Sequence, residues 1–118
     1  MHVLFVHRSG SGQFARLIAR LVAEGADVTL VTEHAAPAQA GVRQLTYAVG
    51  RSTTTHAGLA ATDYHMRTGE AVAGVLRRLA RTDPPDVVIG HIGWGGLLFA
   101  RDALPAVPLM GYCEYYYN

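Results

Sequence analysis

Residues 6–34 read VHRSGSGQFARLIARLVAEGADVTLVTEH and combine a strand end, a glycine-rich loop, a helix and a second strand. The apolar run from Met1 to His7 does not alternate, which is typical of a parallel strand buried on both faces. Apolar residues after the glycines recur at the spacing of one helix face: Phe14, Leu17, Ile18, Leu21 and Val22. Ser11 is placed to cap this helix, Gly25 suits the left-handed residue that ends it, and a strand follows over residues 28–32. This order favours parallel strands joined by a right-handed crossover.

The rest of the chain continues the alternation of strands and helices. We expect strands over residues 42–49, 86–91 and 108–112, and a loop over residues 50–64 that leaves room for a short helix. A helix then stops at Asp83-Pro84-Pro85, and its inward residues are Val72, Val75, Leu76 and Leu79. A further helix grows out of GWGGLLFARDAL, residues 93–104. The sequence therefore predicts an α/β fold, a doubly wound, Rossmann-like parallel sheet of about five strands in the order 3-2-1-4-5, in a single domain over residues 1–118.

In that order, the first and fourth strands are neighbours and the chain reverses direction between them. Ligands of such sheets bind at this switch point, outside the carboxyl ends of the strands. Two glycine-rich loops belong there, Gly10-Ser11-Gly12 after the first strand and Gly93-Trp94-Gly95-Gly96 after the fourth. We therefore expect the functional site at this edge.

Composition excludes several classes of function. All ten Lys and Arg positions are arginines, so a Walker-A loop and a Schiff-base lysine are absent. The net charge is only +1, so charge gives no reason to expect nucleic acid as a partner. Cys113 is the only cysteine, which rules out an internal disulfide. Neither a secretory signal nor a membrane span is evident, so we expect a cytoplasmic protein. His56 and His65 lack metal-ligand spacing, and we expect no metal site.

The first glycine loop admits three interpretations. Gly10 to Ala15 fits the pattern G-x-G-x-x-A, and Glu33 lies where a ribose-binding acid of an NAD(P) site would sit. However, His7, Arg8 and Ser9 separate the strand from the first glycine, which makes a looser loop than the dinucleotide fingerprint. The helix N-terminus also suits another phosphate or a sugar. The third interpretation is a turn with no ligand.

His91 ends the fourth strand, directly before the second glycine loop. A histidine there can bind a sugar hydroxyl or transfer a proton, or it can be purely structural. Trp94 suits stacking on a sugar ring or capping of the core. His7 is a weaker candidate on the same reasoning, and Arg8 is more typical of an isolated surface arginine than of a phosphate ligand.

The end of the chain is dense in tyrosine. Glu114 lies among Tyr112, Tyr115, Tyr116 and Tyr117, and only the first of these tyrosines falls inside the expected last strand. An exposed aromatic patch usually packs against more protein. We therefore expect either a homo-oligomer formed through this tail or a domain completed by another part, and a non-catalytic association module remains an alternative.

Four segments resemble the N-terminal domain of family 4 glycosyltransferases, in the subgroup with a His-x-Gly-Trp-Gly motif after the fourth strand. These segments are MHVLFVHRSGSGQF, GVRQLTY, DVVIGHIGWGGLLFARD and PLMGYCEYYY, which together cover most of the chain in order. The resemblance implies half of a GT-B enzyme that transfers a sugar from a nucleotide-sugar donor, with retention of configuration and without a metal or other cofactor. The N-terminal half of such enzymes mainly shapes the acceptor site.

The resemblance also assigns roles to particular residues. The loop on the side of the donor phosphates corresponds to Gly10, Ser11, Gly12 and Gln13. The crevice motif corresponds to His91, Gly93, Trp94 and Gly95, with His91 near the reacting sugar, and the closing strand supplies Glu114 and Tyr115. HRSGSGQF stands where an asparagine-aromatic-proline sequence is commoner, which implies a different substrate preference. No nucleotide-binding C-terminal half is present in these 118 residues, so the resemblance implies a domain without turnover until that half is supplied in cis or in trans.

Overall fold

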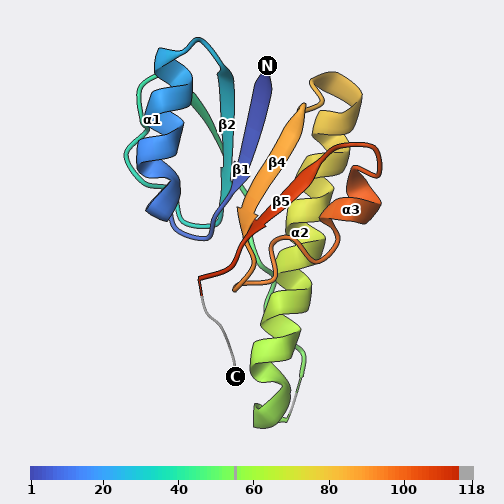
Figure 1. The fold of residues 1–118 in the computed structure, drawn as a ribbon. Coiled ribbons are helices and arrows are strands. Elements are labelled where there is room, and N and C mark those ends of the chain that lie inside the picture. The colour runs from blue at the N-terminus through green and yellow to red at the C-terminus, as the bar shows by residue number, and fades with distance from the viewer. Residues whose placement is uncertain (55, 115–118) are drawn as a thin grey trace.

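The computed structural model describes residues 1–54 and 56–114. Its centre is a five-stranded sheet in the order β3-β2-β1-β4-β5, and every neighbouring pair is parallel (Figure 1). The strands, in chain order, are β1 (His2–Val6), β2 (Asp27–Thr32), β3 (Val42–Thr46), β4 (Val87–His91) and β5 (Leu109–Tyr112). The predicted fold class and strand order are therefore confirmed.

Helices cover both faces of this sheet (Figure 1). On one face lies α1 (Ala15–Ala23), which continues a short 3-10 turn η1 (Gly12–Phe14). On the other face lie α2 (Ala60–Thr82), which follows the turn η2 (Ala57–Leu59), and the one-turn helix α3 (Ala100–Ala103).

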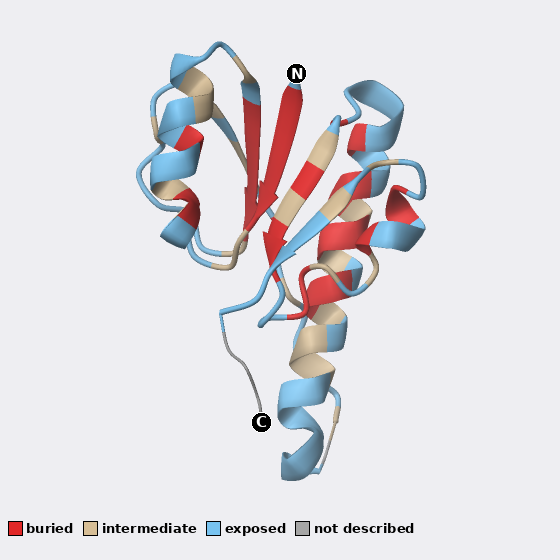
Figure 2. Ribbon diagram, viewed as in Figure 1, coloured by how far each residue is buried: buried red, intermediate tan, exposed pale blue. Residues whose placement is uncertain are grey.

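Alternate residues of β1 enter two separate cores. Val3 and Phe5 pack with Phe14 and Ile18 on the α1 face, whereas Leu4 and Val6 pack with apolar residues of α2 on the other. All five residues of β1 are buried, as the unbroken apolar run predicts (Figure 2). The switch point between β1 and β4 therefore borders a strand that is buried on both faces.

The second helix differs from the expectation. It begins at Ala60, within the segment expected to be a loop, and its first turns extend beyond the sheet into solvent (Figure 2). These turns carry no apolar stripe, so periodicity could not reveal them. An ion pair one helical turn apart supports them, with Arg67 Nε 2.9 Å from Asp63 Oδ2. Its expected end is confirmed, because α2 stops at Thr82 directly before Asp83.

Smaller differences concern the other helices. Leu17, expected to face inward, is 44% exposed on α1. Ser11 precedes η1, but its side chain makes no capping hydrogen bond. The helix expected from residues 93–104 is reduced to the single turn of α3, because its glycine-rich start forms turns instead. Gly25 adopts the expected left-handed conformation, with φ at +85°. Within the described residues, no helix combines the length and the apolarity needed to cross a lipid bilayer.

Candidate functional site

The two glycine-rich loops meet at the carboxyl ends of β1 and β4. Val6 and Gly90 are paired near the end of these strands, and a Cβ atom on Gly96 would lie 3.0 Å from Cγ1 of Val6. The rings of His7 and His91, which follow or end the two strands, have centroids 5.9 Å apart. The structure thus brings together the segments in which the sequence placed the site.

The loop after β1 needs glycine for two reasons. Gly10 and Gly12 have φ angles of +57° and +50°, in the left-handed region. The His7 ring also covers Gly12 so closely that a Cβ atom there would lie 2.3 Å from the ring. The amide of Gly10 donates to the carbonyl of His34 and to Thr32 Oγ1, at 3.0 Å in each case. This amide is therefore committed to the fold and not to a ligand.

The next amides of that loop are differently placed. Among the hydrogen bonds within residues 1–54 and 56–114, none is donated by the amide of Ser11 or Gln13. Both amides precede or begin the first turn of the η1–α1 segment, where unpaired N–H groups and the helix dipole favour an anion. This part of the loop can hold a phosphate or a polar substrate group.

His91 is the most constrained of the predicted site residues. It is 4% exposed, and both of its ring nitrogens are bonded. Nδ1 accepts the amide hydrogen of Gly93 at 2.9 Å, so in the neutral ring the proton is on Nε2. Nε2 then donates to Oε2 of Glu114 at 2.9 Å. His91 therefore ties the loop after β4 to the residue that follows β5, and its nitrogens are not open to a substrate.

Aromatic rings surround this histidine. Its imidazole stacks on Trp94 with a centroid distance of 6.4 Å and an interplanar angle of 26°, and lies 6.0 Å from the ring of Tyr112. Phe14 makes edge contacts with His7 and with Tyr112, at 5.9 and 5.8 Å. The surroundings of His91 are thus mostly aromatic, and the partly exposed carboxylate of Glu114 is a polar side-chain group that contacts it.

Arg8 is not the isolated surface residue that the sequence indicated. Its Nε donates to the hydroxyl of Tyr64 at 2.9 Å and lies 3.5 Å from Oε2 of Glu33. Its guanidinium also lies over the ring of Trp94, with Cζ 4.9 Å from the centroid. The hydroxyl of Tyr64 donates in turn to Glu33. Four segments thus meet at one cation: the ends of β1 and β2, the first turns of α2, and the loop after β4.

Burial and bonding shift the ionisation of this group. Burial raises the pKa of Tyr64, and the hydrogen bond to Glu33 adds to the effect. Burial alone would lower the pKa of Arg8, but the hydrogen bond and charge of Tyr64, followed by those of Glu33, outweigh it and raise the pKa. Both shifts favour the protonated forms, which these groups carry at neutral pH in any case.

This arrangement counts against the NAD(P) interpretation. Glu33, the proposed ribose ligand, has its side chain only 15% exposed, and Oε2 is already shared between Tyr64 and Arg8. The second oxygen, Oε1, keeps acceptor capacity, so it is the low exposure of the side chain that restricts access of a ribose hydroxyl. The G-x-G-x-x-A pattern is present, but the acid that would accompany it serves another purpose in the fold.

The predicted site residues thus fall into groups. The structure unites His91, Trp94 and Glu114, and it places Gly93 and Gly95 in the loop that they border. It sets Gly10, Ser11, Gly12 and Gln13 beside them at the end of β1. Tyr115 lies outside the described residues. Sequence reasoning missed Tyr64, because the helix that carries it was taken for a loop.

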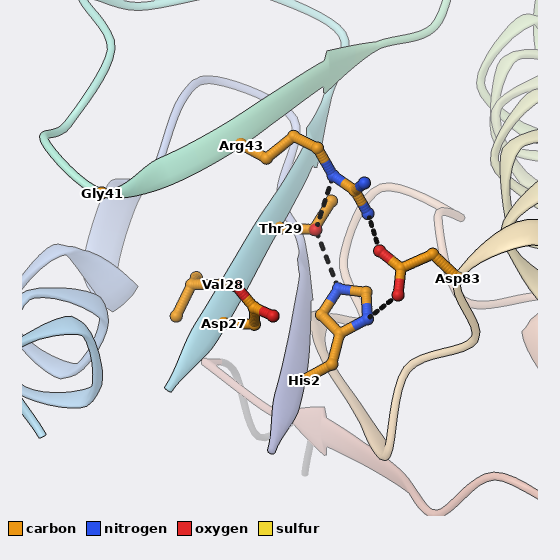
Figure 3. Close-up of a pocket in the computed structure, with 7 residues that line it drawn as sticks. All are labelled: His2, Asp27, Val28, Thr29, Gly41, Arg43 and Asp83. Carbon is orange, nitrogen blue, oxygen red and sulfur yellow. Dashed lines mark hydrogen bonds and ion pairs between the residues drawn. The ribbon is translucent and has the colours of Figure 1, made fainter. Parts of the chain in front are cut away.

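A second polar cluster lies at the opposite, amino-terminal edge of the sheet (Figure 3). His2 Nε2 is 2.8 Å from Thr29 Oγ1, which also accepts from Arg43 Nε, and Arg43 Nη2 donates to Asp83 Oδ2 at 2.8 Å. Asp83 Oδ1 stands 3.6 Å from His2 Nδ1. The order Thr–His–Asp resembles a nucleophile, a base and an orienting acid, but Thr29 is only 2% exposed, so no substrate reaches its hydroxyl. The cluster borders a cavity of about 260 Å³ and joins the starts of three strands to the end of α2.

Comparison with protein families identifies the chain. A model described as "Glycosyl transferase family 4 group" matches residues 24–118. The chain belongs to this family. The match covers His91, the glycine loop after β4 and Glu114, but it begins after the loop of Gly10 to Gln13. No curated protein sequence matches this family 4 chain.

Solved structures of similar fold include sugar transferases and another protein. Apo UGT2 of Phytolacca americana is 18% identical with a TM-score of 0.63, over 94% of this chain and 28% of that one. MurG of Acinetobacter baumannii is 17% identical with a TM-score of 0.53, over 93% of this chain and 34% of that one. The C-terminal domain of the PF1911 hydrogenase of Pyrococcus furiosus is 15% identical with a TM-score of 0.63, over 94% of this chain and 90% of that domain. At these identities the likeness shows the fold alone, and the family 4 chain spans about a third or less of the two transferases.

Proposed function

We propose that this chain is the N-terminal, acceptor-side half of a retaining GT-B glycosyltransferase that transfers a sugar from a nucleotide-sugar donor to an acceptor. One observation carries the proposal. In a chain of the glycosyl transferase family 4 group, two glycine-rich loops meet at the switch point of the sheet, beside the bonded pair of His91 and Glu114. That is where open parallel sheets bind ligands.

The contacts of the site support a division of roles. The amides of Ser11 and Gln13 face the donor phosphates, as the subgroup with a His-x-Gly-Trp-Gly motif implies. Trp94 and the neighbouring glycines shape the acceptor side. The carboxylate of Glu114 accepts a hydrogen bond from an acceptor hydroxyl, and His91 positions that carboxylate. The expected role of His91 was a direct hydrogen-bond or proton-transfer partner of the reacting sugar. This assignment makes it a positioning residue instead, since both of its nitrogens are already bonded.

The isolated domain is proposed to be inactive. The family 4 chain spans 28% of UGT2 and 34% of MurG, and the proposed role leaves most contacts to the nucleotide to a second half. That half is supplied by the same polypeptide or by another one. We further propose cytoplasmic action, with no cofactor beyond the donor substrate.

Transfer assays test the proposal directly. Product formation from UDP-sugars and GDP-sugars is measured for the chain alone and for the enzyme completed by its C-terminal half, and NMR of the product gives the anomeric configuration. We expect turnover with retention only in the completed enzyme. There, Glu114→Gln lowers kcat at unchanged stability, whereas Glu24→Gln, on an exposed carboxylate after α1, changes neither. Absence of transfer in the completed enzyme refutes the proposal.

An NMR titration separates this proposal from the dinucleotide alternative. Saturable shifts of the Gly10 and Gly12 amides by micromolar NAD, lost in Glu33→Ala, would establish an NAD(P) site instead. Under the transferase proposal, NAD leaves these signals unchanged, and nucleotide-sugars cause at most weak, millimolar shifts in the isolated chain.

Association of the domain is a separate expectation. An apolar groove of about 270 Å³ lies between α1 and β5, and its lining includes the exposed side chains of Leu17, Met110 and Tyr112. Its lining residue Tyr112 is the first tyrosine of the C-terminal tail, and residues 115–117 of that tail lie outside the described part of the chain. Light scattering should show a dimer that dissociates when Tyr115 and Tyr117 are replaced by serine. A monomer at all concentrations would refute this association.

A further inference from the structure

We propose that Arg8 binds an oxyanion, a phosphate or a carboxylate, carried by a substrate in the cleft of the transferase. Tyr64, Glu33 and Trp94 hold its guanidinium in place for that contact. The inference rests on the proposed function for the identity of the cleft, and it deepens that function by naming the chemical class of the substrate.

Among the described residues, the guanidinium of Arg8 is contacted at one edge only. Tyr64 and Glu33 both approach the Nε edge of Arg8, at 2.9 and 3.5 Å. In the part of the chain that the structure describes, neither Nη atom donates a hydrogen bond, and Glu33 makes its nearest approach at Nε. These two nitrogens carry four of the five N–H donors of an arginine, and their geometry matches the two oxygens of a carboxylate or phosphate. The unbonded part of Arg8 is therefore the part that recognises oxyanions.

Two aromatic rings hold the guanidinium of Arg8 in place. The Cζ atom lies 4.9 Å from the ring centroid of Trp94 and 5.4 Å from that of Tyr64, so both rings attract the cation. An arginine held this way loses little side-chain freedom when a ligand binds, which favours affinity. The Arg8 side chain nevertheless remains 35% exposed, so a substrate can reach it.

Arg8 is a cation at every ordinary pH, as arginines are, and Tyr64 and Glu33 raise its pKa further against the effect of burial. Glu33 occupies the Nε side and offsets part of the charge, which lowers the cost of desolvating the cation when a substrate covers it. The two Nη atoms keep four polarised N–H groups that these contacts leave unbonded.

Arg8 lies where the two loops of the proposed cleft meet. Arg8 is the second residue after β1, on the same loop as the unbonded amides of Ser11 and Gln13, at the carboxyl edge of the sheet. Trp94 belongs to the loop after β4, directly beside the buried His91. The cation thus joins the two strand ends that border the proposed cleft.

The fluorescence of Trp94 provides a direct test, because it is the only tryptophan of the chain and it contacts Arg8. The 118-residue chain is titrated at constant pH and ionic strength with glucose, glucose 6-phosphate, glucuronate and UDP. We expect a saturable change with at least one of the three anions and none with glucose. In Arg8→Gln the affinity falls about tenfold or more, since a charge-assisted bidentate contact is lost. Arg8→Lys keeps the charge but loses the planar guanidinium, so its affinity should lie between that of the wild type and that of Arg8→Gln.

Controls keep the result attributable to Arg8. Arg20→Gln removes an exposed arginine of α1 that pairs with Glu24, and it should titrate as the wild type does. Since Arg8→Gln also alters the surroundings of Trp94, binding is measured in parallel by calorimetry, and circular dichroism verifies folding. Tyr64→Phe removes the hydroxyl that holds Nε but leaves Arg8 in place, and it should weaken binding severalfold.

Each outcome decides something. A response to UDP alone assigns the oxyanion to the donor, and a response to the sugar phosphate or the sugar acid assigns it to the acceptor. Equal responses to glucose and to the anions, no response at all, or wild-type titration by Arg8→Gln would overturn the inference. Since this test needs no transfer, Arg8-dependent binding in an enzyme without transferase activity would refute the proposed function alone. Transfer with an unchanged KM in Arg8→Gln would refute only the role of Arg8.

Discussion

Nε2 of His91 lies 2.9 Å from Oε2 of Glu114, and the other nitrogen of the same ring accepts the amide of Gly93. The two bonds join residues that follow different strands of the sheet. They also fix the neutral ring with its proton on Nε2. This relationship makes His91 the residue that sets the direction of the Glu114 carboxylate.

Two substitutions of His91 separate its two bonds. The short amide of asparagine can take the place of Nδ1, and the longer amide of glutamine can take the place of Nε2. His91→Asn should therefore retain an acceptor for the Gly93 amide but release Glu114, and His91→Gln should do the reverse. Hydrogen exchange of the Gly93 amide measures the difference. Faster exchange in the glutamine variant only is expected, and equal exchange in both would contradict the assignment.

The left-handed glycines should differ in their cost of substitution. Gly25 has φ at +85° with nothing within 4 Å of an added Cβ, so Gly25→Ala should cost only the conformational strain, about 1–2 kcal/mol. Gly95 has φ at +82°, but a Cβ atom there would lie 2.3 Å from the carbonyl oxygen of His65. Because backbone cannot move aside as a side chain can, Gly95→Ala should cost clearly more. Urea unfolding of both variants measures the costs, and equal values would contradict the close approach.

In the polar cluster of His2, Thr29, Arg43 and Asp83, the buried hydroxyl of Thr29 should stabilise the fold more than the exposed ion pair does. Thr29→Val keeps the shape but leaves Arg43 Nε and His2 Nε2 without their partner, which should cost about 1–3 kcal/mol. Asp83→Asn alters an ion pair whose side chains are 46% and 51% exposed, and it should cost less than about 1 kcal/mol. Unfolding free energies of the two variants test the order. A larger loss for Asp83→Asn would show that the exposed pair matters more.

Two tyrosines should make the fold sensitive to alkali. Burial raises the pKa of Tyr47 far above its ordinary value, and the charge of Glu33 adds to this, while the pKa of Tyr64 is raised in the same direction. The folded state then keeps protons that the unfolded chain loses near pH 10. The associated stability is fully present below pH 10 and is lost as the pH rises further; for Tyr47, whose pKa is raised most, the loss approaches about 1.4 kcal/mol per pH unit.

Unfolding by urea at several pH values between 9 and 11.5 measures this loss. Tyr47→Phe should remove one tyrosine's share of the slope, and Tyr64→Phe should remove a further share. An unchanged slope in Tyr47→Phe would show that its hydroxyl does not contribute.

The sequence predicted the frame of this fold because its signals are local. Unbroken apolar runs marked the strands, and the glycine at position 25 and the prolines after Asp83 marked helix ends. Alternation of strands and helices then left few topologies, since parallel crossovers are right-handed. Juxtaposition of the two glycine loops followed from the strand order alone.

Other features depend on contacts between distant residues and left no local signal. Tyr64 reaches Arg8 across 56 positions, from helical turns that lack an apolar stripe. Arg8 therefore looked isolated, and Glu33 looked available for a ribose. The pairing of His91 with Glu114 likewise spans 23 positions, although both residues had been selected singly.

One contact described above constrains how relatives of this chain can vary. The loop after β4 rests on α2 so closely that a Cβ atom on Gly69 would lie 2.9 Å from the carbonyl oxygen of Gly95, just as Gly95 leaves no room beside His65. Both glycines lie in the contact between the loop and the helix, where an added Cβ atom would meet backbone of the other segment. Neither can therefore acquire a side chain unless the loop and the helix separate. In an alignment of homologues, the two positions should therefore change together, and a sequence with a large residue at one of them should have a loop of different length after its fourth strand.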